Sequence, residues 1–247
     1  MALNWGAQFL RLSVFSPSII AITGADWKAI TKQEESESRQ NIPGGKRLSG
    51  LFGPGRLTVS AVGGRLDVLF TPPEKNEEPS EFKLPVIASW DDALKFFVAA
   101  TAPWITNATF PIVRIAFGAS LLSQADDRKQ AYETLQSLLK SLAIAPERMR
   151  DLLYRINWPI ESKAVPGVMI NRLTTWSTLR VFTKLIQIGG GHVGEPEPSP
   201  EMYAVQLEID HNTDEARTQP FDQGYIGPIF NELVEFANEN VAKGERL

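Results

Sequence analysis

Histidine side chains are the first candidates for chemistry in this sequence, because imidazole exchanges protons near neutral pH. The chain has two, His192 in GGGHV and His211 in LEIDHNTDEA. The glycines Gly189 to Gly191 could form a phosphate cradle or an oxyanion loop, or only a flexible joint between strands. A cradle should open a helix, whereas EPEPSP follows and favours extended structure. We interpret this stretch as a strand break or the start of a long hairpin loop, with His192 as a candidate contact residue.

The second histidine lies among oxygen-bearing side chains in the stretch DHNTDE, from Asp210 to Glu215. Such a set can hold a divalent cation, but the central glycine and distal glutamate of a calcium loop are missing. Asn and Asp are also common turn formers, so we favour a turn. About ten strand residues, roughly 30 Å, separate His211 from the loop that holds His192. We therefore predict no metal site, and keep His211 as a candidate ligand contact.

A glycine-rich, basic stretch runs from Ile42 to Arg56, IPGGKRLSGLFGPGR, and superficially suggests a phosphate loop. A phosphate loop must open a helix, but the β-rich run LTVS follows. We interpret the stretch, including Gly44 to Arg56, as a surface loop that enters a sheet. If it binds an anion, the charges to test are Lys46, Arg47 and Arg56.

Aromatic residues offer a different kind of site. Trp104, Trp158 and Trp176 fall at or near the ends of predicted elements, where rings either line a groove for bases or peptides or fill the edge of a core. Trp176 is our candidate ligand contact among them. The chain has no cysteine, no Gly-x-Ser-x-Gly elbow and no dinucleotide fingerprint. The sequence therefore predicts no catalytic residue and no cofactor.

The overall charge and apolar pattern argue against two classes of partner. The formal net charge is -4 at pH 7 and the isoelectric point is near 5.4, whereas general nucleic-acid binders need a basic surface. No apolar run approaches the length of a membrane span, and the N-terminus lacks the pattern of a secretion signal. We expect a cytoplasmic protein that binds neither membrane nor nucleic acid.

Apolar periodicity predicts most of the secondary structure. Alternation predicts a strand from Phe9 to Phe15 and a hairpin that turns at Gly63-Gly64. Helices are predicted after Ser89, ending at Pro103, and after Ser123, since both serines can cap an apolar stripe. The run PIVRIAFGASLL is apolar on both sides and predicts a central, covered strand. A short helix at APERMRDLL, three late strands and a terminal helix at YIGPIFNELVEFANENVAKG complete the pattern.

This order of elements, β-α-β-β-α-β followed by α-α-β-β-β-α, predicts an α+β fold with antiparallel sheets and helices packed on one face. The first block is ferredoxin-like in order, and the second is a related half. We predict two closely packed halves, residues 1–122 and 123–247.

Several of these segments resemble a known family. A helix after Trp90, the strand PIVRIAFGASLL, the late strand VQLEID and the helix IFNELVEFANENV are similar to a sporadically distributed family of uncharacterised bacterial proteins of about 250 residues, roughly this chain's length. The similarity covers residues 85 to 240 as an order of elements and departs at the N-terminus. It implies a bacterial cytoplasmic protein, accessory to a mobile or defence gene cluster, and brings no catalytic residues.

Function is inferred mainly from the absence of a chemical motif. We predict a non-enzymatic protein-interaction or assembly module, acting as a homo-oligomer or as a subunit of a larger assembly, because sheet edges can pair with another chain. The alternative is a small-molecule or nucleotide-binding enzyme that uses the Gly44–Arg56 loop or the His192 loop.

Overall fold

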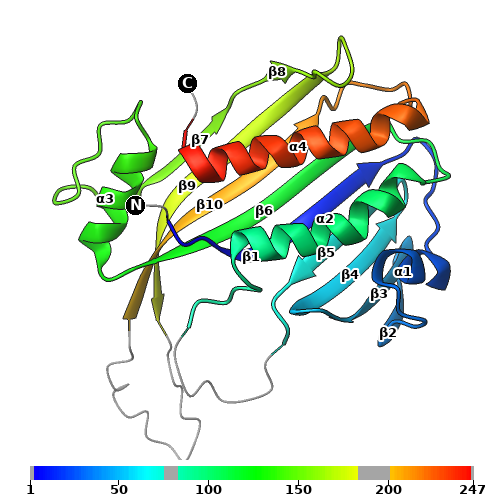
Figure 1. Ribbon diagram of the computed structural model, residues 1–247, viewed down its shortest axis with the longest axis horizontal. Helices are drawn as coiled ribbons and strands as arrows, with labels where there is room; N and C mark the ends of the chain where they lie inside the picture. The colour runs from blue at the N-terminus through cyan, green and yellow to red at the C-terminus, as the bar shows by residue number, and fades with distance from the viewer. Residues whose placement is uncertain (1–2, 75–82, 183–200, 246–247) are drawn as a thin grey trace, which may run out of the picture.

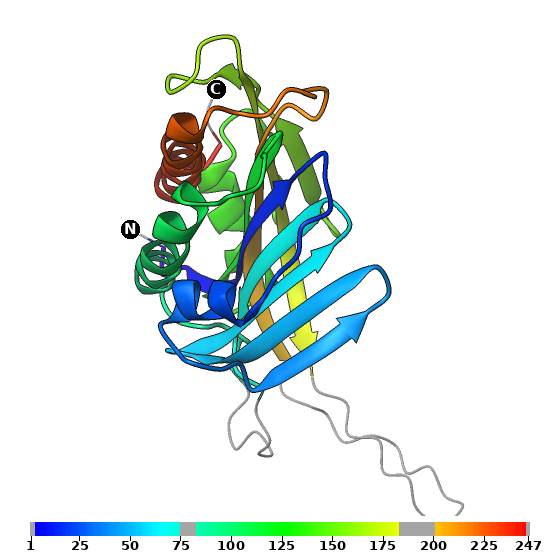
Figure 2. The same ribbon diagram turned by 90° about the vertical axis from the view of Figure 1, so that its right-hand side faces the viewer.

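The protein is a two-layer α+β molecule. Its computed structural model describes residues 3–74, 83–182 and 201–245. Within these residues ten strands form one antiparallel sheet, and all four helices of this part lie on one side of it (Figures 1 and 2). The predicted α+β class, with an antiparallel sheet and helices on one face, is confirmed.

The elements follow the same order twice along the chain. The first unit contains β1 (Gly6–Phe15), α1 (Gly24–Thr31), β2 (Ser38–Ile42), β3 (Gly45–Phe52), β4 (Gly55–Val62), β5 (Arg65–Thr71) and α2 (Trp90–Thr106). The second unit contains β6 (Arg114–Ala125), α3 (Arg128–Leu138), β7 (Leu153–Asn157), β8 (Ile160–Glu161), β9 (Met169–Phe182), β10 (Glu201–Thr213) and α4 (Gln223–Lys243). Each unit therefore reads β-α-β-β-β-β-α.

This repeat differs from the ferredoxin-like order predicted for the first half, which is not confirmed. Four strands separate the two helices of the first unit, where a ferredoxin-like unit has two. The sequence patterns missed β2 and β3, because the polar stretch before Ile42 and the glycines after it resemble a loop. The predicted division between residues 122 and 123 falls inside β6, and the division of the chain into two closely packed halves stays a prediction.

The two units join at the centre of the sheet. Strand order is β2-β3-β4-β5-β1-β6-β10-β9-β7, and β8 also pairs with β9. The central pair, β1 and β6, is antiparallel from Gly6 opposite Leu122 to Phe15 opposite Arg114, with a bulge between Ala7 and Phe9. One continuous sheet therefore spans both units.

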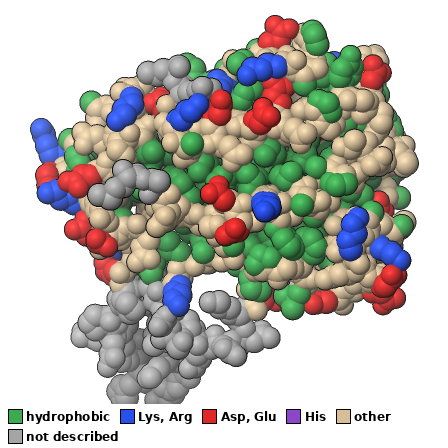
Figure 3. Space-filling view, viewed as in Figure 1, with side chains coloured by type: hydrophobic (Ala, Val, Ile, Leu, Met, Phe, Trp, Pro, Cys, Tyr) green, Lys and Arg blue, Asp and Glu red, His purple; other side chains and the backbone are tan. Residues whose placement is uncertain are grey.

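The core lies between this sheet and the helices. Alternate strand residues such as Leu10, Leu12, Val68 and Phe117 are fully buried on the helix side, because successive side chains of a strand point to opposite faces. Each large apolar side chain buried in this way contributes about 2 kcal/mol relative to exposure. Seen from the helix side, hydrophobic side chains gather over α2 and α4, and most charged groups lie toward the margins (Figure 3).

Helix starts show both successes and errors of the sequence predictions. Ser89 caps α2 as predicted, since its hydroxyl accepts from the Asp92 backbone N–H at 3.2 Å. Helix α2 continues past Pro103 to Thr106, so the predicted stop is wrong. The cap of α3 is Asp127 and not Ser123, because β6 extends to residue 125. The predicted short helix at APERMRDLL is absent, and these described residues form turns.

The glycine-rich stretch that was predicted to be a surface loop is instead two strands of the sheet. Strands β3 and β4 pair from Gly45 opposite Val62 to Phe52 opposite Gly55. Gly53 occupies the turn with φ of 54°, a left-handed conformation that glycine tolerates best. The next turn, at Gly63-Gly64, confirms the predicted hairpin. The chain therefore places its basic stretch within the sheet.

Among the described residues, no helix has both the length and the apolar character needed to cross a membrane.

A buried carboxylate on α4 anchors the segment after β8. Glu232 is 6% exposed. It accepts from the Ser162 hydroxyl at 2.6 Å and from the backbone N–H groups of Lys163 at 2.8 Å and Ala164 at 3.3 Å. Hydrogen bonds to a charged group are worth about 1.5–3 kcal/mol each, and donors left buried without an acceptor are costly. This contact therefore ties the outer strands to the helix layer.

We expect Glu232→Ala to lower the free energy of unfolding by about 2–4 kcal/mol, because buried donors lose their acceptor. Urea unfolding measures this change. Glu235→Ala, an exposed position on the same helix, is the matched control and should change stability by less than about 0.5 kcal/mol. Equal effects of both substitutions would contradict the anchoring role.

Candidate binding face

The side of the sheet that faces away from the helices is the candidate functional site. We call it the bare face, because no described helix or strand covers it (Figure 2). Two hollows are open on it, one of about 770 Å³ over β2, β3, β4, β5 and β1, and one of about 490 Å³ over β1, β6, β10, β9 and β7. Both hollows include Phe9 and Arg11 of β1. The bare face is therefore hollowed on both sides of the central strand pair.

Five neighbouring strands each contribute one arginine to the bare face. In sheet order from β3 to β6, these are Arg47, Arg56, Arg65, Arg11 and Arg114. Strand alternation and register place them all on the side away from the buried core residues. The first unit therefore presents a basic half, and its larger opening, lined by Arg11, Arg47, Arg56 and Arg65, is named the basic hollow.

Three of these arginines already have polar partners, namely Arg56, Arg65 and Arg114, and Arg114 donates to the Asn212 side-chain oxygen at 3.0 Å. Arg56 donates to the Glu37 carboxylate at 3.1 and 3.2 Å. Arg65 binds Asp67 in a bidentate manner at 2.8 and 3.0 Å. Asp67 also accepts from the Ser13 hydroxyl at 2.5 Å. These pairs hold their guanidinium groups in place and reduce their net charge.

The other two members of the basic hollow are different. Within the described part of the chain, neither Arg11 nor Arg47 has a carboxylate at ion-pair distance or a hydrogen-bond acceptor. The Nε atom of Arg11 is buried and has no partner there. Arg47 lies exposed on β3, one strand from the sheet edge. The basic hollow thus contains two guanidinium groups whose donors are available.

Gly118 gives the Arg11 side chain its space. Gly118 lies opposite Arg11 in the β1–β6 pair, and a Cβ atom there would lie 3.2 Å from an Nη atom of Arg11. The guanidinium therefore lies over Gly118, where Arg11 borders both hollows. The neighbouring Ser120 is 0% exposed although it lies on the bare face, because Gln8 and Gln206 hydrogen-bond to it at 2.9 and 3.1 Å. Strand β6 is therefore central as predicted, and side chains of its neighbours cover it on this face.

Strand β10 gives the other hollow a different charge. Glu208 and Asp210 are two residues apart on β10 and both line the smaller hollow, together with Arg155 of β7. Asp210 lies opposite Gly118, so one glycine separates it from Arg11 along the same row of the sheet. The bare face therefore changes from basic over the first unit to mixed and partly acidic over the second.

The structure brings together two of the three basic residues predicted to bind an anion. Arg47 and Arg56 line the basic hollow. Lys46 lies on β3 at a position that alternates with Arg47, so its side chain is directed to the opposite side of the sheet. Arg11, Arg65 and Arg114 were missed. Their signal was present, since each occupies a polar position within a predicted strand.

The remaining predicted contacts lie elsewhere. Trp176 is 0% exposed and packs edge-on against Trp5, with ring centroids 6.4 Å apart. Its indole N–H donates to the Thr174 hydroxyl at 3.3 Å, so its environment is that of a core residue. His192 lies outside the described residues.

His211 is a core residue on the helix side of β10. It is 0% exposed, and its Nδ1 lies 3.2 Å from the Leu233 carbonyl oxygen of α4. The Phe236 ring packs edge-on at 6.4 Å. Burial lowers the pKa of His211 to about 4, and the nearby Arg172 guanidinium acts in the same direction. The imidazole is therefore neutral at physiological pH.

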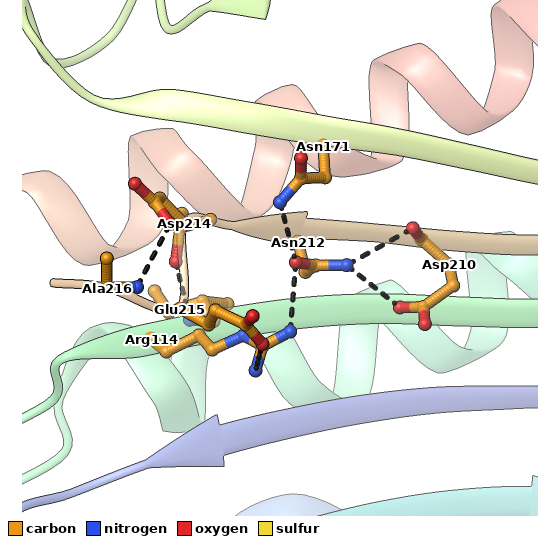
Figure 4. Close-up of polar contacts among 9 residues, drawn as sticks. Arg114, Asn171, Asp210, Asn212, Asp214, Glu215 and Ala216 are labelled. Atoms are coloured by element: carbon orange, nitrogen blue, oxygen red, sulfur yellow. Dashed lines mark hydrogen bonds and ion pairs between the residues drawn. The ribbon is translucent and has the colours of Figure 1, made fainter. Parts of the chain in front are cut away.

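The stretch DHNTDE forms a strand end and a turn. The Asn212 amide oxygen accepts from Arg114 at 3.0 Å and from Asn171 at 3.3 Å, and its amide nitrogen donates to Asp210 (Figure 4). Asp214 accepts from the Ala216 backbone N–H at 3.0 Å, as in an Asx turn. Among the described residues, no group of acidic and histidine side chains has the arrangement of a metal site.

Comparisons of the chain with protein-family models, with curated proteins and with solved structures found no match.

Acid should destabilise the protein through His211. The unfolded histidine, with its ordinary pKa near 6.5, takes up a proton at a higher pH than the folded one does. Stability is thus full above about pH 6.5 and falls as the pH decreases toward 4. Between pH 7.5 and 5.0 the loss due to His211 should be about 2 kcal/mol.

Urea unfolding of wild type and His211→Gln at both pH values measures this difference. The variant should lose about 2 kcal/mol less than wild type over this interval, because the carboxylates titrate in both proteins. Identical losses in the two proteins would show that His211 does not cause the acid sensitivity.

Proposed function

We propose that this chain is a non-enzymatic protein-interaction module of a bacterial cytoplasmic system, and that the bare face makes the contact. The observation that carries the proposal is the one-sided covering of a ten-stranded sheet. A sheet of this width presents on the order of 1,000 Å² on one face, from strand spacing and rise. Protein–protein contacts of standard size bury about 800 Å² on each partner.

The composition of the bare face also supports a protein contact. Arginine is enriched in protein interfaces, and the available donors of Arg11 and Arg47 have a high desolvation cost unless a partner supplies acceptors. The described residues bring together no metal-ligand set. His211 and Trp176 are enclosed in the core. These features favour binding over catalysis.

Position-specific photo-crosslinking tests this function. A photo-reactive residue in place of Thr58 or Thr175 lies on the bare face, within the two hollows. The same residue in place of Lys95 or Glu235 lies exposed on the helices. In extracts of the producing cells, both bare-face positions should capture the same protein, and the helix positions should not.

Purification of the captured protein and a direct binding measurement then verify the contact. Light scattering determines whether the partner is a second copy, since a self-associating chain exceeds the monomer mass of 27.4 kDa. Capture from the helix positions alone would contradict a contact through the bare face.

The alternative, a small-molecule or nucleotide-binding enzyme, makes a different prediction. A ligand selective for the native state raises the Tm, by an increment that grows with ligand concentration above Kd. We expect no increase with nucleotides, sugar phosphates or divalent metals at millimolar concentration. A concentration-dependent increase with one nucleotide, abolished by Arg47→Gln, would favour the enzyme alternative over the module.

A further inference from the structure

The basic hollow contains more hydrogen-bond donors than the protein itself uses. The guanidinium groups of Arg11 and Arg47 have no acceptor among the described residues. Thr58 and Ser60 of β4 also line the basic hollow, and their hydroxyl groups make no side-chain hydrogen bond among the described residues. Donors clustered in this way match a ligand that presents several acceptors, and charge favours an anionic one.

The spacing of the arginines favours two separate negative charges over one small anion. Arg11 and Arg47 lie three strands apart and are offset by two residues along the strands. Strand spacing and rise place their Cα atoms about 16 Å apart. The Arg11 guanidinium lies over Gly118 of β6, on the side of β1 away from Arg47, so its donors lie farther from Arg47 than its Cα atom does. The two guanidinium groups therefore suit separate negative charges on an elongated ligand.

An extended acidic peptide meets this requirement. Alternate residues of an extended chain point to the same side and lie about 6.6 Å apart, so four to six residues cover the distance between the two arginines. The side chains of such a segment carry carboxylates toward the sheet, and its backbone offers carbonyl oxygens to the hydroxyl groups of Thr58 and Ser60. Carboxylates and arginine also form bidentate, charge-assisted pairs.

Nucleic acid fits the same surface less well. A phosphate backbone carries a negative charge on every nucleotide, so part of it would lie against the carboxylates of Asp67 and Glu74 in the basic hollow or of Glu208 and Asp210 in the adjoining one. A peptide can carry its carboxylates at the two arginines and neutral residues elsewhere. Single strands are bound by stacking on open aromatic rings. The Phe15 ring is occupied by the guanidinium groups of Arg65 and Arg114, at 5.4 and 5.1 Å from its centroid. Phe9 offers a single half-buried ring, which lines both hollows.

We propose that the basic hollow binds an extended acidic segment of the protein partner, with Arg11 and Arg47 as its anchors. This inference rests on the proposed function and adds the chemistry of the partner. Glu208 and Asp210 limit the acidic segment to the strands from β3 to β6, because carboxylates placed over β10 would meet like charges.

Fluorescence anisotropy with a labelled octapeptide of alternating glutamate and serine tests the inference. The wild-type chain should bind this probe, and binding should weaken as salt is raised because the pairs are partly exposed. Arg11→Gln and Arg47→Gln should each weaken binding about tenfold. Arg155→Gln, on the bare face but outside the basic hollow, is the matched control and should change binding less than about twofold.

Arg47 is exposed near the sheet edge, so a folding defect in Arg47→Gln is not expected, and a thermal melt of each variant verifies this. The octapeptide of alternating lysine and serine should not bind. An unchanged affinity in both anchor variants, or tighter binding of a single-stranded oligonucleotide than of the acidic peptide, would overturn the inference.

The two proposals fail in distinguishable ways. If the acidic peptide does not bind while a protein is still captured from Thr58 and Thr175, the bare face is an interface and the partner chemistry is wrong. If the bare-face positions capture nothing and the peptide does not bind, both proposals fail.

Discussion

The antiparallel pairing of β1 with β6 is the interaction on which the rest of the molecule depends. These strands begin the two β-α-β-β-β-β-α units, and every other strand is added outward from them. Each unit alone would end in an unpaired strand edge at this point, and unpaired edges invite pairing with other chains. Joining the two edges satisfies the backbone groups of both and produces one wide sheet with its outer edges far apart.

The helices of both units pack on the same side of this sheet. This arrangement leaves the other side exposed to solvent, so its side chains must be mostly polar or small. Strand residues on the helix side are large and apolar, whereas those on the bare face are mostly charged, hydroxylated or small. Such a face is stable in water without a covering layer, as antiparallel sheets allow. It also leaves arginines, carboxylates and hydroxyl groups accessible over a broad area, which is the basis of the proposed contact.

Local sequence signals predicted much of this structure. The remaining elements depend on pairing between strands that are distant in the sequence, and local signals do not reveal them. The Gly63-Gly64 hairpin, the cap at Ser89 and the strand at β10 could be read from the sequence because turn chemistry, capping and alternation are local. Strands β2 and β3 could not, since their polar and glycine-rich residues lack a local strand pattern and are held by pairing, of β2 with β3 and of β3 with β4. Arg47 and Arg56 could be predicted as anion contacts because they lie close together in one basic stretch of the sequence. Arg11 lies far from that stretch in the sequence, and only the strand order, which places β1 beside β5, brings it to the same hollow.

Arg11, Gly118 and Asp210 lie in one row across three neighbouring strands, and this row affects the direction in which a partner can bind. Positive charge on one side of the small glycine and negative charge on the other give the bare face an electrical axis that runs across the strands. A partner that carries charges of both signs can align with this axis in one sense only, because the reversed placement brings like charges together. The sheet can therefore determine which end of a bound chain lies over each unit, and so toward which margin of the molecule the remainder of the partner is led.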